Sequence, residues 1–123
     1  MKRQRFIQLV EEALDALPEP FRSRVRNLAV VVEDAPPPGD DGAVDGELMG
    51  LYDGVPLTER AAWDAVPTDR VFLYQRNIER YAAQRAAQER LPLDDLIREE
   101  VRLTVLHELG HYFGLDEDAL EDV

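Results

Sequence analysis

The chain of 123 residues contains no cysteine. This absence excludes disulfide bonds, cysteine-based zinc fingers, thiol catalysis and iron–sulfur clusters together. Aromatic residues make up only 7% of the chain, and there are only two histidines. Basic residues are also scarce, because 14 Lys and Arg stand against 26 Asp and Glu, which gives a formal net charge of −12. A surface this acidic repels phosphate backbones and anionic lipids, so we expect neither nucleic acid nor membrane partners.

Long apolar runs are missing as well. The longest, at residues 28–32, falls far short of the roughly 20 residues that a membrane helix needs. The basic start of the chain is soon followed by Glu11, Glu12 and Asp15, so it does not have the pattern of a signal peptide. We therefore expect a cytoplasmic protein, which the lack of cysteine also fits. An acidic surface of this kind could still attract basic peptides.

The rest of the composition is that of a globular protein, with 45% hydrophobic and 33% charged residues, and the length predicts one domain. Apolar residues spaced three and four apart predict a helix at residues 1–17. Segments rich in Val or with apolar alternation predict strands at residues 27–34, 47–54 and 70–76. Two further helices are expected at residues 77–91 and 93–113. The predicted fold class is therefore α+β, with about three strands packed against helices.

Several residues mark the expected helix ends and loops. Asn77 is placed to cap the helix at residues 77–91. Asp94 and Asp95 fall in the first turn of the last helix, where negative charge suits the helix dipole. Gly114 is placed to end that helix with a positive φ. The Pro-, Gly- and Asp-rich residues 35–46 predict a surface loop.

The two histidines lie four residues apart in the segment HELGH, residues 107–111. Residues at this spacing share one face of a helix, so His107 and His111 can bind one ion. Glu108 lies about 100° round the helix from His107, which suits a general base that reaches a water on the metal. Random placement would give two histidines this spacing in roughly one case in 60, so the pattern favours a metal site over an incidental pair.

A metal site of this kind needs a third protein ligand. Since the chain has no other His and no Cys, that ligand must be a carboxylate, unless a partner supplies it. The candidates follow Gly114: Asp116, Glu117, Asp118, Glu121 and Asp122. Two neutral imidazoles and one carboxylate leave a charge of +1 on a Zn²⁺ centre and one position open for water, which is a catalytic type of site.

The segment HELGHYFGLDE, residues 107–117, resembles the H-E-x-x-H-x-x-G-x-x-H/D motif of zincin metallopeptidases. The chain is most similar to the small bacterial minimal zincin-like family, whose members resemble Asp-zincins and consist of little beyond this domain. The segments GLYDGVPLTER and VFLYQRNIER, ahead of TVLHELGHYFG, extend the resemblance over most of the chain from about Asn27. The resemblance implies one minimal zincin-like domain over residues 1–123, with the HExxH helix near the C-terminus.

The resemblance also implies the third ligand. In the family motif it lies ten residues after the first His, which is Glu117 here, where the Asp-zincin pattern has Asp. Asp118 is the second candidate and Asp116 the third, each one residue away in register. A Glu side chain can coordinate zinc through oxygen at about 2.0–2.2 Å if the turn adjusts.

The implied activity is that of a zinc metallopeptidase acting on a peptide or protein substrate. Zn²⁺ held by His107, His111 and Glu117 would activate a water that attacks a peptide bond, with Glu108 as general base. The side chains that could assist the oxyanion are Tyr52, Tyr74, Tyr81 and Tyr112. The substrate would lie extended along an exposed strand edge, at residues 47–54 or 70–76.

Two departures from larger zincins leave alternatives open. Metzincins have a Met-turn after the motif, whereas the only internal methionine here is Met49. Six residues follow Glu117, so we expect no second half-domain and a substrate cleft that lacks one wall. One alternative is a metal-binding zincin-scaffold protein without proteolytic activity that acts as an interaction module. The other is a structural domain in which the histidine pair is incidental.

Overall fold

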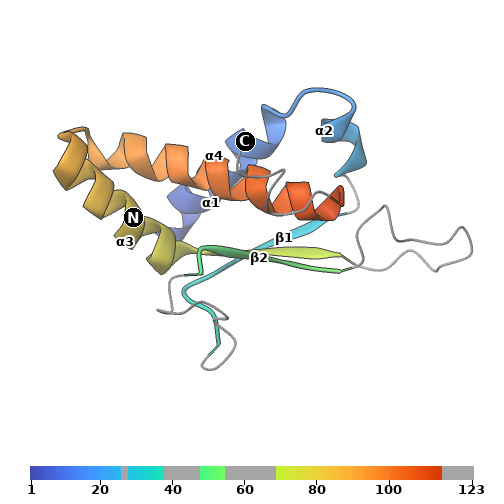
Figure 1. Cartoon of the computed structure of the whole chain (residues 1–123), viewed down its shortest axis with the longest axis horizontal. Helices are drawn as coiled ribbons and strands as arrows, with labels where there is room; N and C mark the ends of the chain where they lie inside the picture. The colour runs from blue at the N-terminus through green and yellow to red at the C-terminus, as the bar shows by residue number, and fades with distance from the viewer. Residues whose placement is uncertain (26–27, 38–47, 55–68, 115–123) are drawn as a thin grey trace, which may run out of the picture.

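The computed structural model describes residues 1–25, 28–37, 48–54 and 69–114. In these ranges a three-stranded sheet lies against one layer of helices (Figure 1). Strand β3 (Arg70–Tyr74) is central, with β1 (Ala29–Glu33) parallel to it on one side and β2 (Gly50–Asp53) antiparallel on the other. The predicted α+β class is confirmed, and each strand forms within the predicted bounds but is shorter.

Alternation along the strands decides which residues face the helices. In β3, Val71 and Leu73 are buried, whereas Arg70 is exposed and Phe72 is only partly buried. Residues paired across neighbouring strands point to the same face of a sheet. Gly50 is the partner of Leu73 in β2, and Tyr52 is the partner of Val71. Both β2 residues therefore face the helices.

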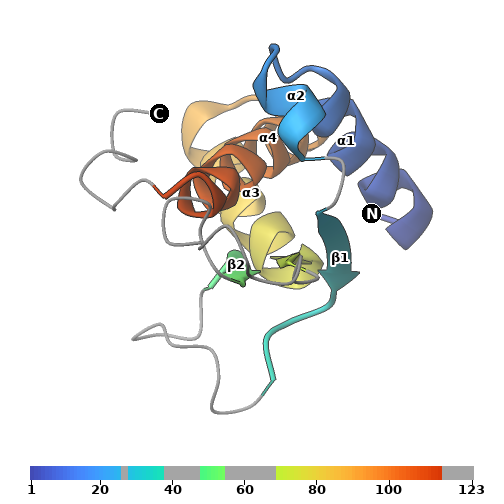
Figure 2. The same cartoon turned by 90° about the vertical axis from the view of Figure 1, so that its right-hand side faces the viewer.

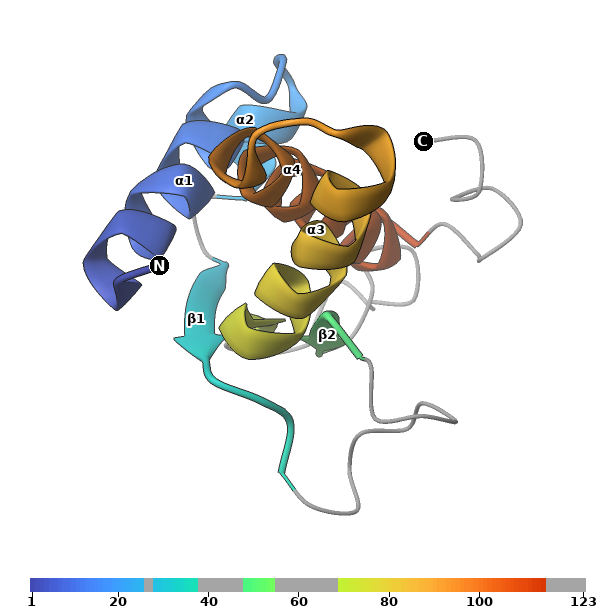
Figure 3. The same cartoon turned by 90° about the vertical axis from the view of Figure 1, so that its left-hand side faces the viewer.

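Four helices form in the described ranges: α1 (Arg3–Asp15), α2 (Phe21–Arg24), α3 (Gln75–Glu89) and α4 (Leu93–Tyr112). The longest, α4, lies over the sheet and packs against both α1 and α3, which flank it on opposite sides (Figures 2 and 3). The single-turn helix α2 was not predicted, because it follows the proline-containing segment 18–20 that favours a turn. No helix in the described ranges has the apolar length needed to cross a bilayer.

The core lies between α4, its two flanking helices and the sheet. Its buried apolar side chains are Phe6, Leu9, Val10, Leu17, Val71, Leu73, Ile78, Ala82, Leu96, Ile97, Val101, Val105 and Leu109. Five of these belong to α4, more than to any other element. Because α4 is packed on several sides, the residues near its C-terminal end are held in fixed positions relative to β2 and β3.

The prediction that Asn77 caps α3 is wrong. Strand β3 runs directly into the helix, so α3 begins at Gln75 and its N-cap is Tyr74. Asn77 lies inside the first turn and is 6% exposed, and its side-chain nitrogen donates to the carbonyl oxygen of Leu48 at 2.8 Å. The side chain thus ties α3 to the residues just before β2. By contrast, Gly114 has the expected positive φ, at 86°, beyond the end of α4.

An ion pair between α3 and α4 accompanies the apolar core. The carboxylate of Glu100, which is 4% exposed, accepts a hydrogen bond of 2.6 Å from Arg85. Arg85 also bonds Glu89, one turn further along α3, at 2.7 Å. These bonds to Glu89 and Glu100 hold the pKa of Arg85 above its usual range, and the bond from Arg85 lowers the pKa of Glu89. The buried carboxylate of Glu100 is therefore compensated by a cation from the neighbouring helix.

Candidate metal centre

His107 and His111 lie one turn apart near the C-terminal end of α4, on the same face of the helix. Their ring centroids are 5.0 Å apart, and the ring planes are inclined at 83°. One ligand atom from each of His107, Glu108 and His111 lies within 4.8 Å of the other two. The residues that the sequence singled out are therefore brought together by the fold.

The donor set and its spacing fit a divalent metal ion. Two imidazole nitrogens bound to one zinc at about 2.0–2.1 Å lie roughly 3.5 Å apart. The ligand atoms of the three residues all lie within 4.8 Å of one another, so the two imidazoles are near enough to approach one ion together. Both histidine residues are partly exposed, whereas Glu108 is buried. An ion at the rings would therefore be reachable from solvent on one side and protein-lined on the other.

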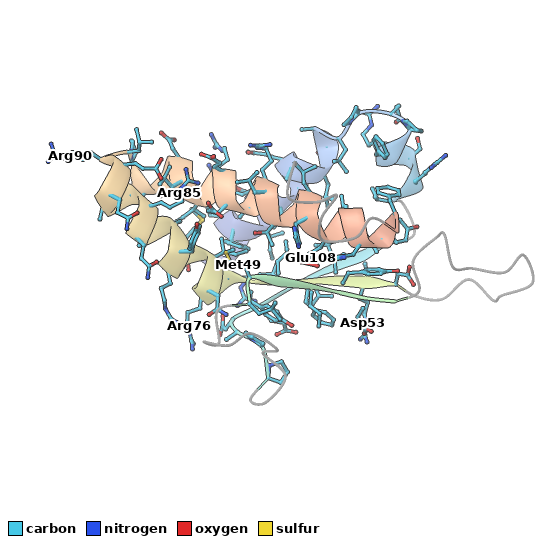
Figure 4. The ribbon with its side chains drawn as sticks, viewed as in Figure 1. Met49, Asp53, Arg76, Arg85, Arg90 and Glu108 are labelled. Atoms are coloured by element: carbon cyan, nitrogen blue, oxygen red, sulfur yellow. The ribbon has the colours of Figure 1, made fainter. Side chains whose placement is uncertain are left out.

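Glu108 points from α4 toward the sheet (Figure 4). The residue is 6% exposed, and its Oε1 lies 4.0 Å from Nε2 of His111. This separation is too long for a hydrogen bond. It keeps the carboxylate beside the imidazole pair, close enough to reach a water molecule between them. The role of Glu108 as general base stays a prediction.

Gly50 of β2 brings the edge strand against this part of α4, and the sequence reasoning missed it. A Cβ atom at position 50 would lie 2.9 Å from Cγ2 of Thr104, 3.1 Å from Cγ of Glu108 and 3.1 Å from the carbonyl oxygen of Phe72. A side chain at this position would force its neighbours to shift. A signal was present, because an isolated glycine within a strand pattern often marks a close backbone approach.

A buried carboxylate lies at the other end of β2. Asp69, immediately before β3, is 2% exposed and accepts a hydrogen bond of 2.8 Å from the hydroxyl of Tyr52. Gly54 leaves room for it, since a Cβ atom there would lie 2.5 Å from Oδ1 of Asp69. The ring of Tyr52 contacts that of Tyr112 edge-on, with centroids 5.9 Å apart. This group fixes the C-terminal end of β2 to the end of α4, and no local sequence pattern predicts it.

The four tyrosines proposed to assist the oxyanion occupy different places. The hydroxyl of Tyr52 donates to Asp69, and that of Tyr112 donates to the carbonyl oxygen of Arg24 at 3.2 Å. Tyr74 stacks on Phe72, with centroids 6.5 Å apart. Tyr81 is 43% exposed on α3. The hydroxyls of Tyr52 and Tyr112 thus already serve as donors within the fold.

Two site predictions remain to be placed. The third-ligand candidates Asp116, Glu117 and Asp118 lie outside the described residues, so Glu117 stays a prediction. Of the two strands expected to offer an edge to a substrate, residues 70–76 are excluded, because β3 pairs with a strand on each side. Strand β2 pairs only with β3 among the described strands, and it is the one that touches Glu108.

Comparison with known protein families gives one result that bears on the whole site. The family model described as zincin-like metallopeptidase matches residues 25–123. These are 99 of the 123 residues, and they include all three strands, α3 and α4. No curated protein matches the chain.

Proposed function

Because this chain belongs to the zincin-like metallopeptidase family, we propose that it is a zinc-dependent peptidase with Glu108 as general base. Membership of the family supports a divalent metal, usually zinc, and a peptide or protein substrate. The observation that carries the proposal is the cluster of His107, Glu108 and His111, whose ligand atoms lie within 4.8 Å of one another on α4. This is the arrangement that a helical H-E-x-x-H motif needs in order to bind a metal and act on a water.

His107, His111 and Glu117 are the proposed ligands. The assignment of Glu117 depends on the spacing of the family motif, with Asp118 and Asp116 as the other candidates. When bound, zinc supplies a water of lowered pKa and polarises the carbonyl group that is attacked. The protein's own contribution is to hold the imidazoles one helical turn apart and to keep Glu108 beside them.

In this proposal Glu108 takes a proton from the attacking water and passes it to the leaving nitrogen. Its buried position supports the role. A Cβ atom at Gly50 would lie 3.1 Å from Cγ of Glu108, so the absence of a side chain at position 50 leaves room for the glutamate against β2. Because the side chain of the base is already held in position, little conformational entropy is lost in positioning it for the reaction.

The substrate is proposed to lie extended along β2. Among the described strands, none pairs with the outer edge of β2, and such an edge offers backbone N–H and C=O groups to an added strand. Because Gly50 lies against Glu108, a peptide paired with β2 passes close to the general base. The order of strands in the sheet supports β2 over β3 for this role.

We also propose that residues 1–123 form one domain. Helix α1 lies outside the matched residues 25–123, yet Phe6, Leu9 and Val10 belong to the same core as α4. A shared core of this kind is typical of a single cooperative unit. A cytoplasmic location and a bacterial origin stay predictions from the sequence.

The substitution Glu108→Gln tests the proposed function. It keeps the size of the side chain and removes its basicity, so peptide cleavage should fall by about 10²–10⁴-fold while zinc content stays the same. Cleavage of a peptide library and metal content should be measured on the same preparations of the wild type and the variant. Equal cleavage by both proteins would contradict the proposal. Zinc binding without cleavage by the wild type would instead support the interaction-module alternative.

A further inference from the structure

A groove of about 650 Å³ opens where the start of α1, the first half of α3 and the start of α4 meet. In Figure 3, α1 with the N-terminus is seen on the left and α3 to the right of it. The cationic side chains that line the groove are Lys2, Arg5, Arg76 and Arg80. Only two carboxylates line it, Glu79 and Asp94. The groove is thus locally basic in a protein whose formal net charge is −12.

Three of the four cations of this groove differ from most of the other arginines, because they form no ion pair with a carboxylate in the part of the chain that the structure describes. Ion pairs to nearby carboxylates are formed by Arg3, Arg22, Arg70, Arg85 and Arg98, and within the groove by Arg5, whose Nη1 lies 3.9 Å from Oε1 of Glu12. Lys2, Arg76 and Arg80 are exposed and form no ion pair within the ranges that the structure describes. Glu79 does not compensate them, because it pairs with the N-terminal ammonium at 2.7 Å. The groove therefore keeps a surplus of positive charge that a ligand can use.

Arg80 connects this groove to the edge strand. It also lines a smaller pocket of about 100 Å³ together with Met49, Asn77, Tyr81 and Gln84. Met49 directly precedes β2, and Asn77 bonds the carbonyl oxygen of Leu48. Figure 4 shows Met49 where the sheet meets α3, with Arg76 on the first turn of that helix. The cationic surface thus begins beside the N-terminal end of β2 and continues across α3.

We propose that this cationic surface binds an acidic peptide segment, and that the adjoining part of the same peptide lies along β2. The second half of this statement rests on the proposed peptidase function, whereas the first half does not. Salt screens charges beyond about 8–10 Å, so a bound peptide responds to the nearby arginines more than to the distant acidic surface. A long polyanion such as nucleic acid would extend over that acidic surface and be repelled.

The proposal also names a substrate class. Net charge alone would favour basic peptides, but the charge nearest to β2 favours Asp and Glu on one side of the cleaved bond. The small pocket beside Met49 combines the cation of Arg80 with the polar groups of Tyr81 and Gln84. A carboxylate side chain can be hydrogen-bonded by all three.

The binding test uses the Glu108→Gln protein, so that no peptide is consumed. Fluorescence anisotropy would compare two labelled peptides, one of alternating Glu and Ala and one of alternating Gln and Ala. The Glu peptide should bind more tightly, and its affinity should fall as salt is added. Reversing two charges in Arg76→Glu/Arg80→Glu should weaken its binding roughly tenfold or more. The matched control is Arg24→Glu/Arg102→Glu, which changes net charge equally at exposed arginines outside the groove and should have little effect.

The proposal is overturned if the two peptides bind equally, if neither binds at low salt, or if both charge-reversed pairs lose the same affinity. Displacement of the Glu peptide by inorganic phosphate at constant ionic strength would reassign the groove to small anions and also overturn it. In a cleavage assay on a mixed peptide library, the wild type should prefer peptides with Asp or Glu on one side of the bond. Loss of that preference in the Arg76→Glu/Arg80→Glu variant would link the groove to cleavage. If the wild type cleaves no peptide, the measured binding of the Glu peptide still holds, and the result counts against the proposed peptidase function.

Discussion

Gly50 decides how close the edge strand comes to the candidate metal centre. A Cβ atom added at position 50 would lie 2.9 Å from Cγ2 of Thr104 and 3.1 Å from Cγ of Glu108. Both distances are shorter than an ordinary van der Waals contact. We predict that Gly50→Ala lowers the free energy of unfolding by about 1–3 kcal/mol, the usual cost of overpacking a filled site. Thermal or denaturant unfolding of the variant and the wild type measures this difference.

A second substitution separates local crowding from a general effect of alanine in the strand. Thr104→Ser removes the methyl group that lies nearest to the added Cβ atom. In the Gly50→Ala background it should restore part of the lost stability, whereas in the wild type it should not stabilise. If Gly50→Ala is as stable as the wild type, β2 does not contact α4 as closely as described.

Residues of the site differ in how far the sequence could predict them. His107, Glu108 and His111 lie within five residues on one helix, so helical geometry alone predicts that the two imidazoles share a face with Glu108 beside them. The contact of Gly50 with Glu108 joins residues 58 positions apart in the sequence, and the bond of Tyr52 to Asp69 depends on the pairing of two strands. Such contacts follow from the assembled fold and leave only weak local signals, such as a glycine within a strand.

At the scale of elements, the contact between α3 and α4 includes one ion pair whose carboxylate is buried. Arg85→Met would leave Glu100 without its cation, and an uncompensated buried carboxylate is costly. We predict that the unfolding midpoint falls by roughly 5–10 °C at neutral pH. The double variant Arg85→Met/Glu100→Met removes both charges and should recover part of this loss. A double variant less stable than the single one would contradict this account.

The same variant has an expected pH dependence. In the wild type the hydrogen bond from Arg85 holds the pKa of Glu89 below its usual range. A carboxyl group whose folded pKa is lowered stabilises the protein above its unfolded pKa, and this contribution is lost as the pH falls through the folded value. The stability difference between the wild type and Arg85→Met should therefore shrink as the pH is lowered below about 4.5. Unfolding midpoints across this range provide the measurement.

The elements themselves were largely predictable from periodicity, since all three strands and the three long helices form where the sequence indicates. Boundaries were less predictable. Asn77 has the side chain of an N-cap, but β3 enters α3 without a loop, so the helix begins two residues earlier. The order of strands was not predictable either. Strand β3 is central because β1 and β2 pair with its opposite sides, and no single segment of the sequence encodes that arrangement.

At the scale of the whole molecule, the amino-acid composition gives the net charge but does not show where the charged side chains lie on the surface. A net charge of −12 correctly describes the average surface. The basic groove forms because residues 2–5 and 76–80, far apart in the sequence, are brought together where three helices meet. The family resemblance stated from the motif is confirmed by the match to residues 25–123, whereas the identity of the third ligand depends on a tail outside the described residues.

The central claim is that α4 holds a divalent metal between its two histidines. A crystal structure of the protein grown with zinc, with anomalous diffraction data collected at the zinc absorption edge, tests it most directly. We expect one strong anomalous peak bonded to the imidazoles of His107 and His111 at about 2.0–2.1 Å, with a carboxylate of Glu117 as third ligand and Glu108 beside the open position. Zinc bound elsewhere, or no peak near either histidine at saturating zinc, would contradict the account.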